Sequence, residues 1–282
     1  DSFVSQEIND KILLNSLNLQ AGLIYNSDIF GKINLGLRYV SDKYSLENYQ
    51  IDQYIDNTQM VNSKTTFITA EYLKTFSKIE LKAKTENFIF GDNKSNMFSS
   101  SVILKLKNNN SFTANYKLFS STPNYNFLLY RSNYENYNWN NQFDNSITNS
   151  ISLGLKLNEI IDLDLDLISV KKHIQFEKII NDLADSSEYS IIPVQHNGNL
   201  DILKLQLGRK INFGKFSIDS KLLFQKSLSD DIINLPQIVS RNTFYFSTDM
   251  FKKALFLQTG FGVKYFSKFN MNGYDPLLSE LY

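Results

Sequence analysis

The chain has 282 residues, and its 29 Lys and Arg side chains balance 29 Asp and Glu side chains, so the formal net charge is zero. This balance excludes the strongly basic surface of a nucleic-acid-binding protein, and the absence of cysteine excludes disulfides and thiolate metal ligands. No apolar run reaches the roughly 18 residues of a transmembrane helix.

The first half of the chain alternates apolar and polar residues. In 13–25, leucines at 17, 19 and 23 are separated by Asn18, Gln20 and Gly22. Because successive side chains of a strand point to opposite faces, the pattern predicts a strand with one apolar and one polar face. The alternation continues in 32–40, 66–75, 79–89, 98–106 and 111–119. The triplet Asn108-Asn109-Asn110 between the last two suits the positive-φ positions of a turn.

The second half continues this pattern. Segments 151–157 and 161–167 flank a turn at Asn158-Glu159, and the other expected pairs are 200–207 with 211–224 and 242–250 with 254–266. The total is about twelve strands in hairpins. In the last strand, the apolar positions are expected to face lipid, and Gln258, Gly260 and Lys264 to face the interior.

Short and long connections alternate along the chain. The turns within hairpins have about two to four residues, whereas 41–64, 120–146 and 171–199 are long, polar excursions. Outer-membrane barrels have short periplasmic turns and long extracellular loops. The sequence therefore predicts an all-β fold, an antiparallel transmembrane β-barrel in the bacterial outer membrane, with residues 1–282 as one domain. Because the first and last strands would both end on the extracellular side, we expect a larger barrel that this domain leaves incomplete at both ends.

Aromatic residues lie beside the tight turns. Phe30, Phe76 and Phe251 each adjoin one, where the interfacial aromatic girdle of a barrel is expected. The alternative is that these rings follow the general preference of aromatics for strands and pack in a soluble core.

Two of the long excursions carry features of their own. Phe176, Ile179, Ile180 and Leu183 have the spacing of an amphipathic helix, predicted over 175–184, which covers its own apolar side or packs over the barrel mouth. The excursion 120–146 is rich in Tyr, Phe and Trp, more than a fully solvated loop would carry. We expect its rings to pack across the mouth and to leave Arg131 and Glu135 near the passage.

Enzymatic chemistry is not indicated, and we predict no catalytic residue, metal ligand or cofactor. His173 and His196 have no nucleophile motif beside them, so solvated loop histidines are the favoured interpretation over a general base. Gly260 and Gly262 lie inside a strand, where they relieve crowding or permit curvature and do not form a phosphate-binding turn.

The polar strand faces supply candidate lumen-lining residues. Asp162, Asp164 and Asp166 share one face of a strand, where a hydrated wall is favoured over a cation site. Lysines on neighbouring strands would offset these acids if all face the lumen. The full set of candidates is Lys82, Lys84, Lys105, Lys107, Asp162, Asp164, Asp166, Gln258 and Lys264.

Several blocks carry a family resemblance. Residues 121–127 and 130–139, residues 235–236 with 240–243 and 254–260, and Tyr274-Asp275-Pro276 together resemble the Putative porin family of Bacteroidetes outer membranes. The resemblance implies an outer-membrane barrel and, through the family name, a pore. It does not identify a solute.

The leading functional hypothesis is a passive channel for small hydrophilic solutes, with membrane lipid and the solute as its partners. Arg131, Glu135 and Arg241 are candidates either for the constriction or for ordering a loop. The alternative is a non-conducting structural barrel subunit of a secretion or assembly complex, with other outer-membrane proteins as partners. A soluble secreted β-sheet binding protein is a third hypothesis, and an enzyme is the last.

Overall fold

The computed structural model describes residues 8–47, 60–158, 160–180, 189–229 and 233–282. Twelve of its strands form one antiparallel sheet, in which neighbours follow one another along the chain. These strands are β1 (Lys11–Ser27), β2 (Gly31–Glu47), β3 (Met60–Phe76), β4 (Ile79–Gly91), β5 (Asn96–Lys105), β6 (Ser111–Ser121), β9 (Ser146–Leu157), β10 (Ile161–Lys171), β13 (Asn199–Phe213), β14 (Phe216–Ser227), β15 (Ile238–Met250) and β16 (Leu255–Phe266).

The remaining elements are short and lie in the connections. They are α1 (Tyr125–Leu128), β7 (Leu129–Tyr130), β8 (Trp139–Asn140), β11 (Ile174–Ile180), β12 (Tyr189–Gln195), β17 (Tyr274–Asp275) and β18 (Glu280–Leu281). In the described part of the chain, no helix is both long and apolar enough to cross a bilayer. The all-β class expected from the sequence is confirmed.

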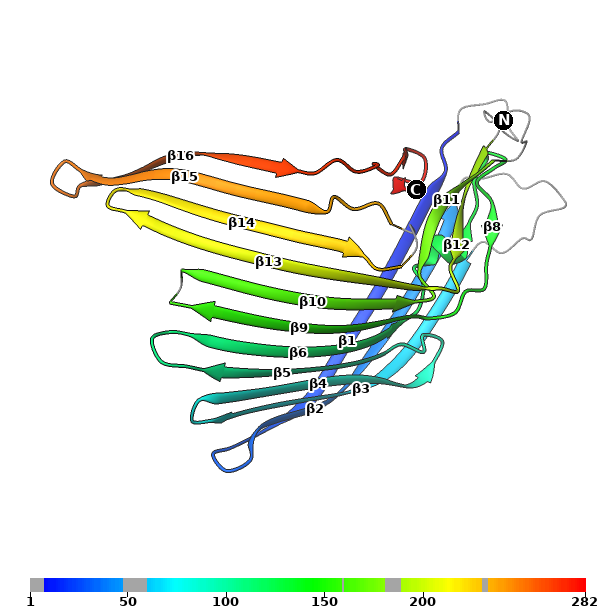
Figure 1. Ribbon diagram of the computed structural model, residues 1–282. Coiled ribbons are helices and arrows are strands. Elements are labelled where there is room, and N and C mark those ends of the chain that lie inside the picture. Colours follow the sequence, from blue (N-terminus) through cyan, green and yellow to red (C-terminus); the bar gives the residue numbers. More distant parts are fainter. Residues whose placement is uncertain (1–7, 48–59, 159, 181–188, 230–232) are drawn as a thin grey trace.

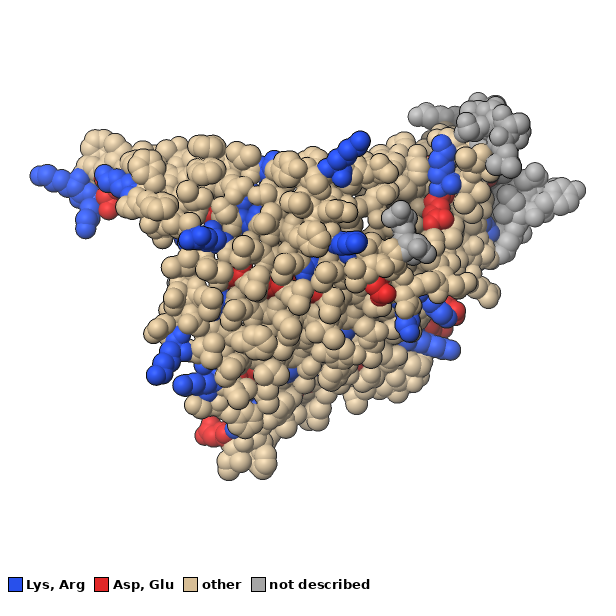
Figure 2. Space-filling view, viewed as in Figure 1, with Lys and Arg blue, Asp and Glu red and all other residues tan. Residues whose placement is uncertain are grey.

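The sheet curls, so that β1 to β3 pass behind the later strands, and the tight hairpin turns gather at its left end in Figure 1. The longer connections, with β8, β11 and β12, gather at the opposite end. Figure 2 shows Lys and Arg side chains projecting at the turn end, while large parts of this side carry no charge. The alternation of connections that the sequence predicts is therefore present in three dimensions.

Strand register separates an apolar face from a polar face. Leu165 of β10 lies opposite Leu153 and Leu205, and Leu205 lies opposite Phe224, so one apolar row crosses four strands. The adjacent row places Asp164 between Gly154 and Gln206. Many of the apolar side chains are well exposed, including Leu205 at 40% and Leu23 at 82%. An apolar wall of this extent is typical of a face that contacts lipid.

At the end of β2 and the beginning of β3, near the longer connections, the polar side chains lie on the outer face and apolar side chains lie on the inner face. Up to Tyr39 the outer face of β2 is apolar, but beyond it Ser41 lies opposite Lys64 and Lys43 lies opposite Asn62. On the inner face, Tyr44 and Leu46 are buried at 4% exposure. β1, β2 and β3 each have 17 residues, more than the roughly 9–11 that span a bilayer. The exchange marks where the lipid-facing part of these strands ends.

Strand ends differ from the sequence prediction most clearly at two connections. The turn between β13 and β14 is Gly214-Lys215, not 208–210, because alternation continues through Phe213 and Gly214 adopts the left-handed φ of +61° that the turn requires. The excursion expected over 41–64 is shorter, since β2 extends to Glu47 and β3 begins at Met60.

The helix predicted over 175–184 is wrong where the structure describes it. Residues 174–180 form β11, which pairs with β12 from Ile174 opposite Gln195 to Ile180 opposite Tyr189. Ile174 and Phe176 point to one side at period two and are buried at 8% and 3%. β12 supplies hydrogen-bond partners for the backbone of this segment, which is rich in β-branched residues. Pairing with a partner strand therefore outweighs the helical spacing of its apolar residues. The part of the prediction over 181–184 lies outside the described residues.

The backbone conformation of the asparagine turn and the role of Gly260 agree with the sequence prediction. Asn108 and Asn109 have φ values of 57° and 56°, as expected of the asparagine turn. A Cβ on Gly260 would lie 2.2 Å from the Phe244 carbonyl oxygen, so glycine permits close approach of β15 and β16 there. Phe30, Phe76 and Phe251 are exposed at the turn end, and their role in a membrane girdle stays a prediction.

Candidate functional site on the inner wall and at the mouth

The inner face of β4 carries ion pairs. The Lys84 Nζ lies 2.8 Å from Glu71 Oε1 of β3, and the Lys82 Nζ lies 2.7 Å from Glu80 Oε1 on the same strand. Lys105, at the end of β5, contacts the second oxygen of Glu80 at 3.4 Å. Lys107, the other lysine predicted nearby, lies in the turn beyond β5, outside this network.

The three aspartates of β10 form an acidic strip on the same inner face. Asp162 lies opposite Lys156, and Asp166 lies opposite Lys204. Asp164 accepts a hydrogen bond from Gln206 Nε2 at 3.5 Å. Among the described residues, no group of three or more His, Asp or Glu side chains is arranged to hold a metal ion. The strip is therefore partly compensated by lysines on both flanking strands.

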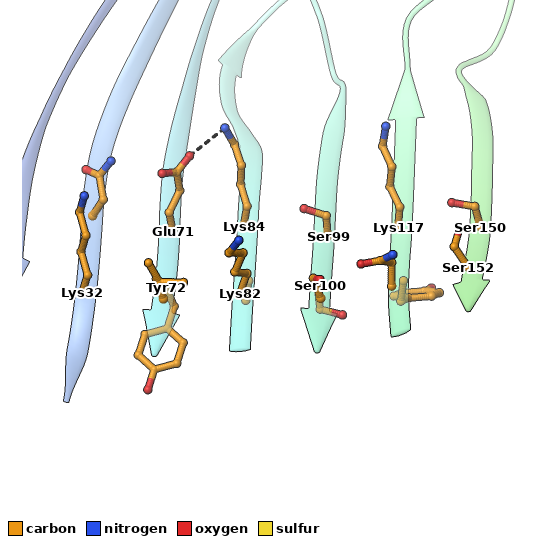
Figure 3. A pocket seen from close by; sticks show the side chains of 16 residues that line it. Lys32, Glu71, Tyr72, Lys82, Lys84, Ser99, Ser100, Lys117, Ser150 and Ser152 are labelled. Carbon is orange, nitrogen blue, oxygen red and sulfur yellow. Dashed lines mark ion pairs between the residues drawn. The ribbon is translucent and has the colours of Figure 1, made fainter. Parts of the chain in front are cut away.

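Beside the acidic strip, the inner face is hollowed into a groove of about 570 Å³ that includes the Lys84–Glu71 ion pair, shown in Figure 3. Its charged lining consists of Lys32, Lys82, Lys84, Lys117 and Glu71. Short polar side chains of β5, β6 and β9 complete the floor; they include Ser99, Ser101, Asn115, Ser150 and Ser152. Lys32 and Lys117 were not among the sequence candidates, although both alternate with apolar neighbours and could have been assigned to the polar face.

The remaining predicted wall residues lie on the last two strands. Arg241 of β15 lies opposite Lys264 of β16, and Ser247 lies opposite Gln258. Arg241 thus lies within a strand, whereas Arg131 lies in the connection between β7 and β8. The predicted role of Arg241, in a constriction or in ordering a loop, stays a prediction.

We define the mouth cap as the connection 122–145, the β11–β12 hairpin and residues 274–282. Its centre is a buried cluster of Tyr130, Trp139, Phe176 and Ile191, against which Phe127, Tyr137, Leu278 and Tyr282 pack. The rings of Tyr130 and Trp139 stack with centroids 4.9 Å apart. Four rings of 120–146 are thus packed and not solvated, and segments distant in sequence supply some of their partners. Their placement across a barrel mouth stays a prediction.

Hydrogen bonds join the cap to the first two strands. Tyr125 donates to Asp42 Oδ2 at 2.9 Å, and Tyr44 donates to the Leu129 carbonyl oxygen at 3.1 Å. Asn133 Nδ2 donates to Oδ1 of Asp10, the residue that precedes β1, at 2.6 Å. Burial raises the pKa of Tyr125 to about 12, so its hydroxyl remains a donor well above neutral pH.

Another set of hydrogen bonds joins the cap to the segment after β16. Tyr137 donates to Asp275 Oδ2 at 2.7 Å, and Asn126 Nδ2 donates to Glu280 Oε1 at 2.7 Å. Asp275 is 3% exposed. The cap therefore bridges the beginning of the sheet and the segment that follows its last strand.

The candidate constriction residues have different surroundings. Arg131 is 4% exposed and donates to the Tyr130 carbonyl oxygen, whereas Glu135 is exposed in the β7–β8 connection. Burial of Arg131 favours loop ordering, one of its two predicted roles, over contact with a passing solute. The sequence alone could not distinguish these roles.

The two histidines lie at the base of the β11–β12 hairpin. Their ring centroids are 6.5 Å apart, and His196 Nε2 lies 2.6 Å from Glu177 Oε1. Burial lowers the pKa of His173 below its usual value, and the neighbouring His196 acts in the same direction. Both histidines lie outside the strands, as expected of loop histidines, and both are partly buried.

The profile of the Putative porin family matches residues 1–282. The chain belongs to this family. The match does not bear on the bacterial group, so the Bacteroidetes origin stays an expectation. No curated protein matched the chain.

Solved outer-membrane proteins share the fold. The ferric enterobactin receptor PfeA of Pseudomonas aeruginosa is similar with a TM-score of 0.66 and 11% identity, over 94% of this chain and 43% of that protein. The copper transporter OprC gives 0.65 and 14%, over 87% and 43%. The siderophore receptor PirA of Pseudomonas aeruginosa gives 0.63 and 11%, over 91% and 49%. The chain thus spans less than half the length of each. The protein has an outer-membrane β-barrel fold and is located in the bacterial outer membrane.

Proposed function

We propose that this protein forms a passive channel for small hydrophilic solutes. The observation that carries the proposal is the inner face: from β2 to β15, the rows of residues opposite the apolar face contain Lys, Asp, Ser, Asn and Gln, and many of the charges are paired. A hydrated, charge-lined wall is what a water-filled barrel lumen requires. A wall of this composition would be costly to cover with a dry plug.

The mouth cap supplies the narrowing element of this channel. It lies at the end of the sheet that carries the longer connections, where β8, β11 and β12 gather in Figure 1. Its packing is held by the buried aromatic cluster and by hydrogen bonds to Asp42 and Asp275. The cap therefore restricts passage, and its removal widens it.

Single-channel recording in planar bilayers tests the channel. Deleting residues 124–138 removes the part of the cap that carries Tyr130, Arg131 and Glu135, and we expect single-channel conductance to rise and ion selectivity to fall. Replacing the turn 107–110, at the opposite end of β5 and β6, with glycines of equal number serves as the control and should leave both unchanged. Absence of any conductance in the parent protein and in the deletion variant would disprove the channel.

A non-conducting structural subunit is the second candidate, and the tightly packed cap favours it. The similar solved proteins include one named as a ferric enterobactin receptor and one named as a siderophore receptor. Under this alternative the cap is a docking surface for another outer-membrane protein. The same deletion would then abolish co-purification of that partner, with no current in either variant.

A further inference from the structure

The groove on the inner wall has the chemistry of a binding site. We propose that it binds a hydroxylated solute carrying a phosphate or carboxylate group, such as a sugar phosphate or sugar acid. This proposal extends the proposed channel function by naming the class of solute that its wall recognises.

Strand register places two lysines on either side of a serine. Lys84 of β4 lies opposite Ser99 of β5, which lies opposite Lys117 of β6. Adjacent strands are about 4.8 Å apart, so the two lysine backbones are roughly 10 Å apart, and both flexible side chains reach one anionic group between them. Figure 3 shows Lys84 and Lys117 extending in the same direction on either side of Ser99.

The positive charge of the groove exceeds its negative charge. Its lining carries four lysines and the carboxylate of Glu71, which pairs with Lys84. Within the described part of the chain, Lys32 and Lys117 form no ion pair. The Lys117 ammonium lies 5.4 Å from the centroid of the Phe119 ring, a contact that does not neutralise its charge. An anion would supply a partner for Lys117 and a further one for Lys32, whose charge already acts on Glu71.

The neutral side chains of the groove suit the rest of such a solute. Ser99, Ser101 and Ser150 carry short hydroxyls, each of which both donates and accepts. The volume of about 570 Å³ lies in the range of roughly 300–1,000 Å³ that is usual for small-molecule pockets. Sugar hydroxyls, which also donate and accept, match this lining better than an apolar ligand would.

The acidic strip limits the site on one side. Ser152, at the edge of the groove, lies opposite Asp166 of β10. A phosphate or carboxylate group is repelled by the β10 aspartates, and its favoured position is toward the lysines of β2, β4 and β6. The wall therefore orients the solute, with its anionic group on the lysine side.

Direct binding tests the site independently of conduction. We would titrate glucose 6-phosphate into the purified protein in detergent by isothermal calorimetry and compare it with gluconate and with glucose. Both anions should bind, glucose should not, and the tighter of the two identifies phosphate or carboxylate as the preferred group. In Lys32→Gln/Lys117→Gln, the dissociation constant for the tighter anion should rise about tenfold or more.

Two further variants serve as controls for the effect of charge in the groove. Lys221→Gln removes one charge from the same inner face, opposite Gly208 and Arg241 and outside the groove, and should leave binding unchanged. Lys117→Arg keeps the charge and should retain binding. Equal affinity of the parent and the double glutamine variant, or no binding of either anion to the parent, would overturn the site. A protein that binds without conducting disproves the channel alone, and one that conducts without binding disproves the site alone.

Discussion

Asp275 shows how a single side chain secures the mouth cap. Besides accepting from Tyr137, its other oxygen accepts from the backbone amides of Leu277 and Leu278, both at 2.9 Å. Tyr137→Phe leaves one carboxylate oxygen buried without this donor, which costs about 1–3 kcal/mol. We expect faster hydrogen exchange of the Leu277 and Leu278 amides in this variant.

The neighbouring tyrosine provides a control for this effect. Tyr134 packs edge-on against Tyr137 with centroids 6.2 Å apart, and within the described residues its hydroxyl makes no hydrogen bond. Tyr134→Phe should therefore leave the exchange of both amides unchanged. If the two variants behave alike, the Tyr137–Asp275 hydrogen bond does not stabilise the segment.

The assignment of sheet faces can be tested at two adjacent residues of β13. Leu205 lies in the apolar row, while Gln206 lies beside Asp164. Leu205→Arg should lower the free energy of unfolding in lipid by about 2–4 kcal/mol if its depth is near the midplane. Gln206→Arg should be tolerated because it gains an acidic neighbour. Urea unfolding in lipid vesicles measures both, and equal losses would contradict the assignment.

Residue placement could be predicted from sequence only where local periodicity determines it. The face of Asp164 follows from alternation within its own strand. The burial of Arg131 does not, because it depends on a cap built from segments far apart in the chain. The tyrosine partners Asp42 and Asp275 are likewise distant in sequence, and a single sequence contains no signal that pairs them.

At the level of elements, the β11–β12 hairpin should respond to acid. Burial holds the pKa of His173 below its usual value of about 6.5, so the unfolded hairpin binds a proton at higher pH than the folded one. The contribution of His173 to stability is complete above the unfolded pKa and is lost as the pH falls through the lower folded pKa.

The chain's single tryptophan reports this change. Trp139 contacts Phe176 of β11 with ring centroids 5.9 Å apart, so loosening of the hairpin should expose it and shift its emission to longer wavelength below about pH 6. His173→Gln should flatten this pH dependence. A parent protein with constant emission between neutral and acid pH would contradict the prediction.

The same hairpin explains one failure of sequence reasoning. A short apolar run such as Phe176, Ile179 and Ile180 fits helical spacing, and no local feature separates this from a strand. The partner that decides the outcome, β12, follows after an intervening segment. Long alternating segments, by contrast, gave the correct strand type, although the β13–β14 turn shows that their ends are less predictable.

At the level of the whole molecule, the sheet has two open edges. β1 and β16 are its outermost strands and do not pair with each other in the part of the chain that is described. Unpaired edges are unfavourable in lipid. We expect residues 1–282, refolded alone in detergent, to lack the heat-dependent mobility shift of a closed barrel on gel electrophoresis. A heat-modifiable, protease-resistant monomer would show that these edges can join.

The extension of β2 beyond the lipid-facing part of the sheet has a consequence for the cell surface. Beyond Tyr39, β2 continues for eight residues to Glu47, which at about 3.3 Å per residue is roughly 26 Å of strand with a polar exterior. This rim stands in water on the side of the long connections. Lys43 and Lys64 on its outer face should therefore react with a membrane-impermeant amine reagent on intact bacteria, and antibodies raised against this rim should stain living cells.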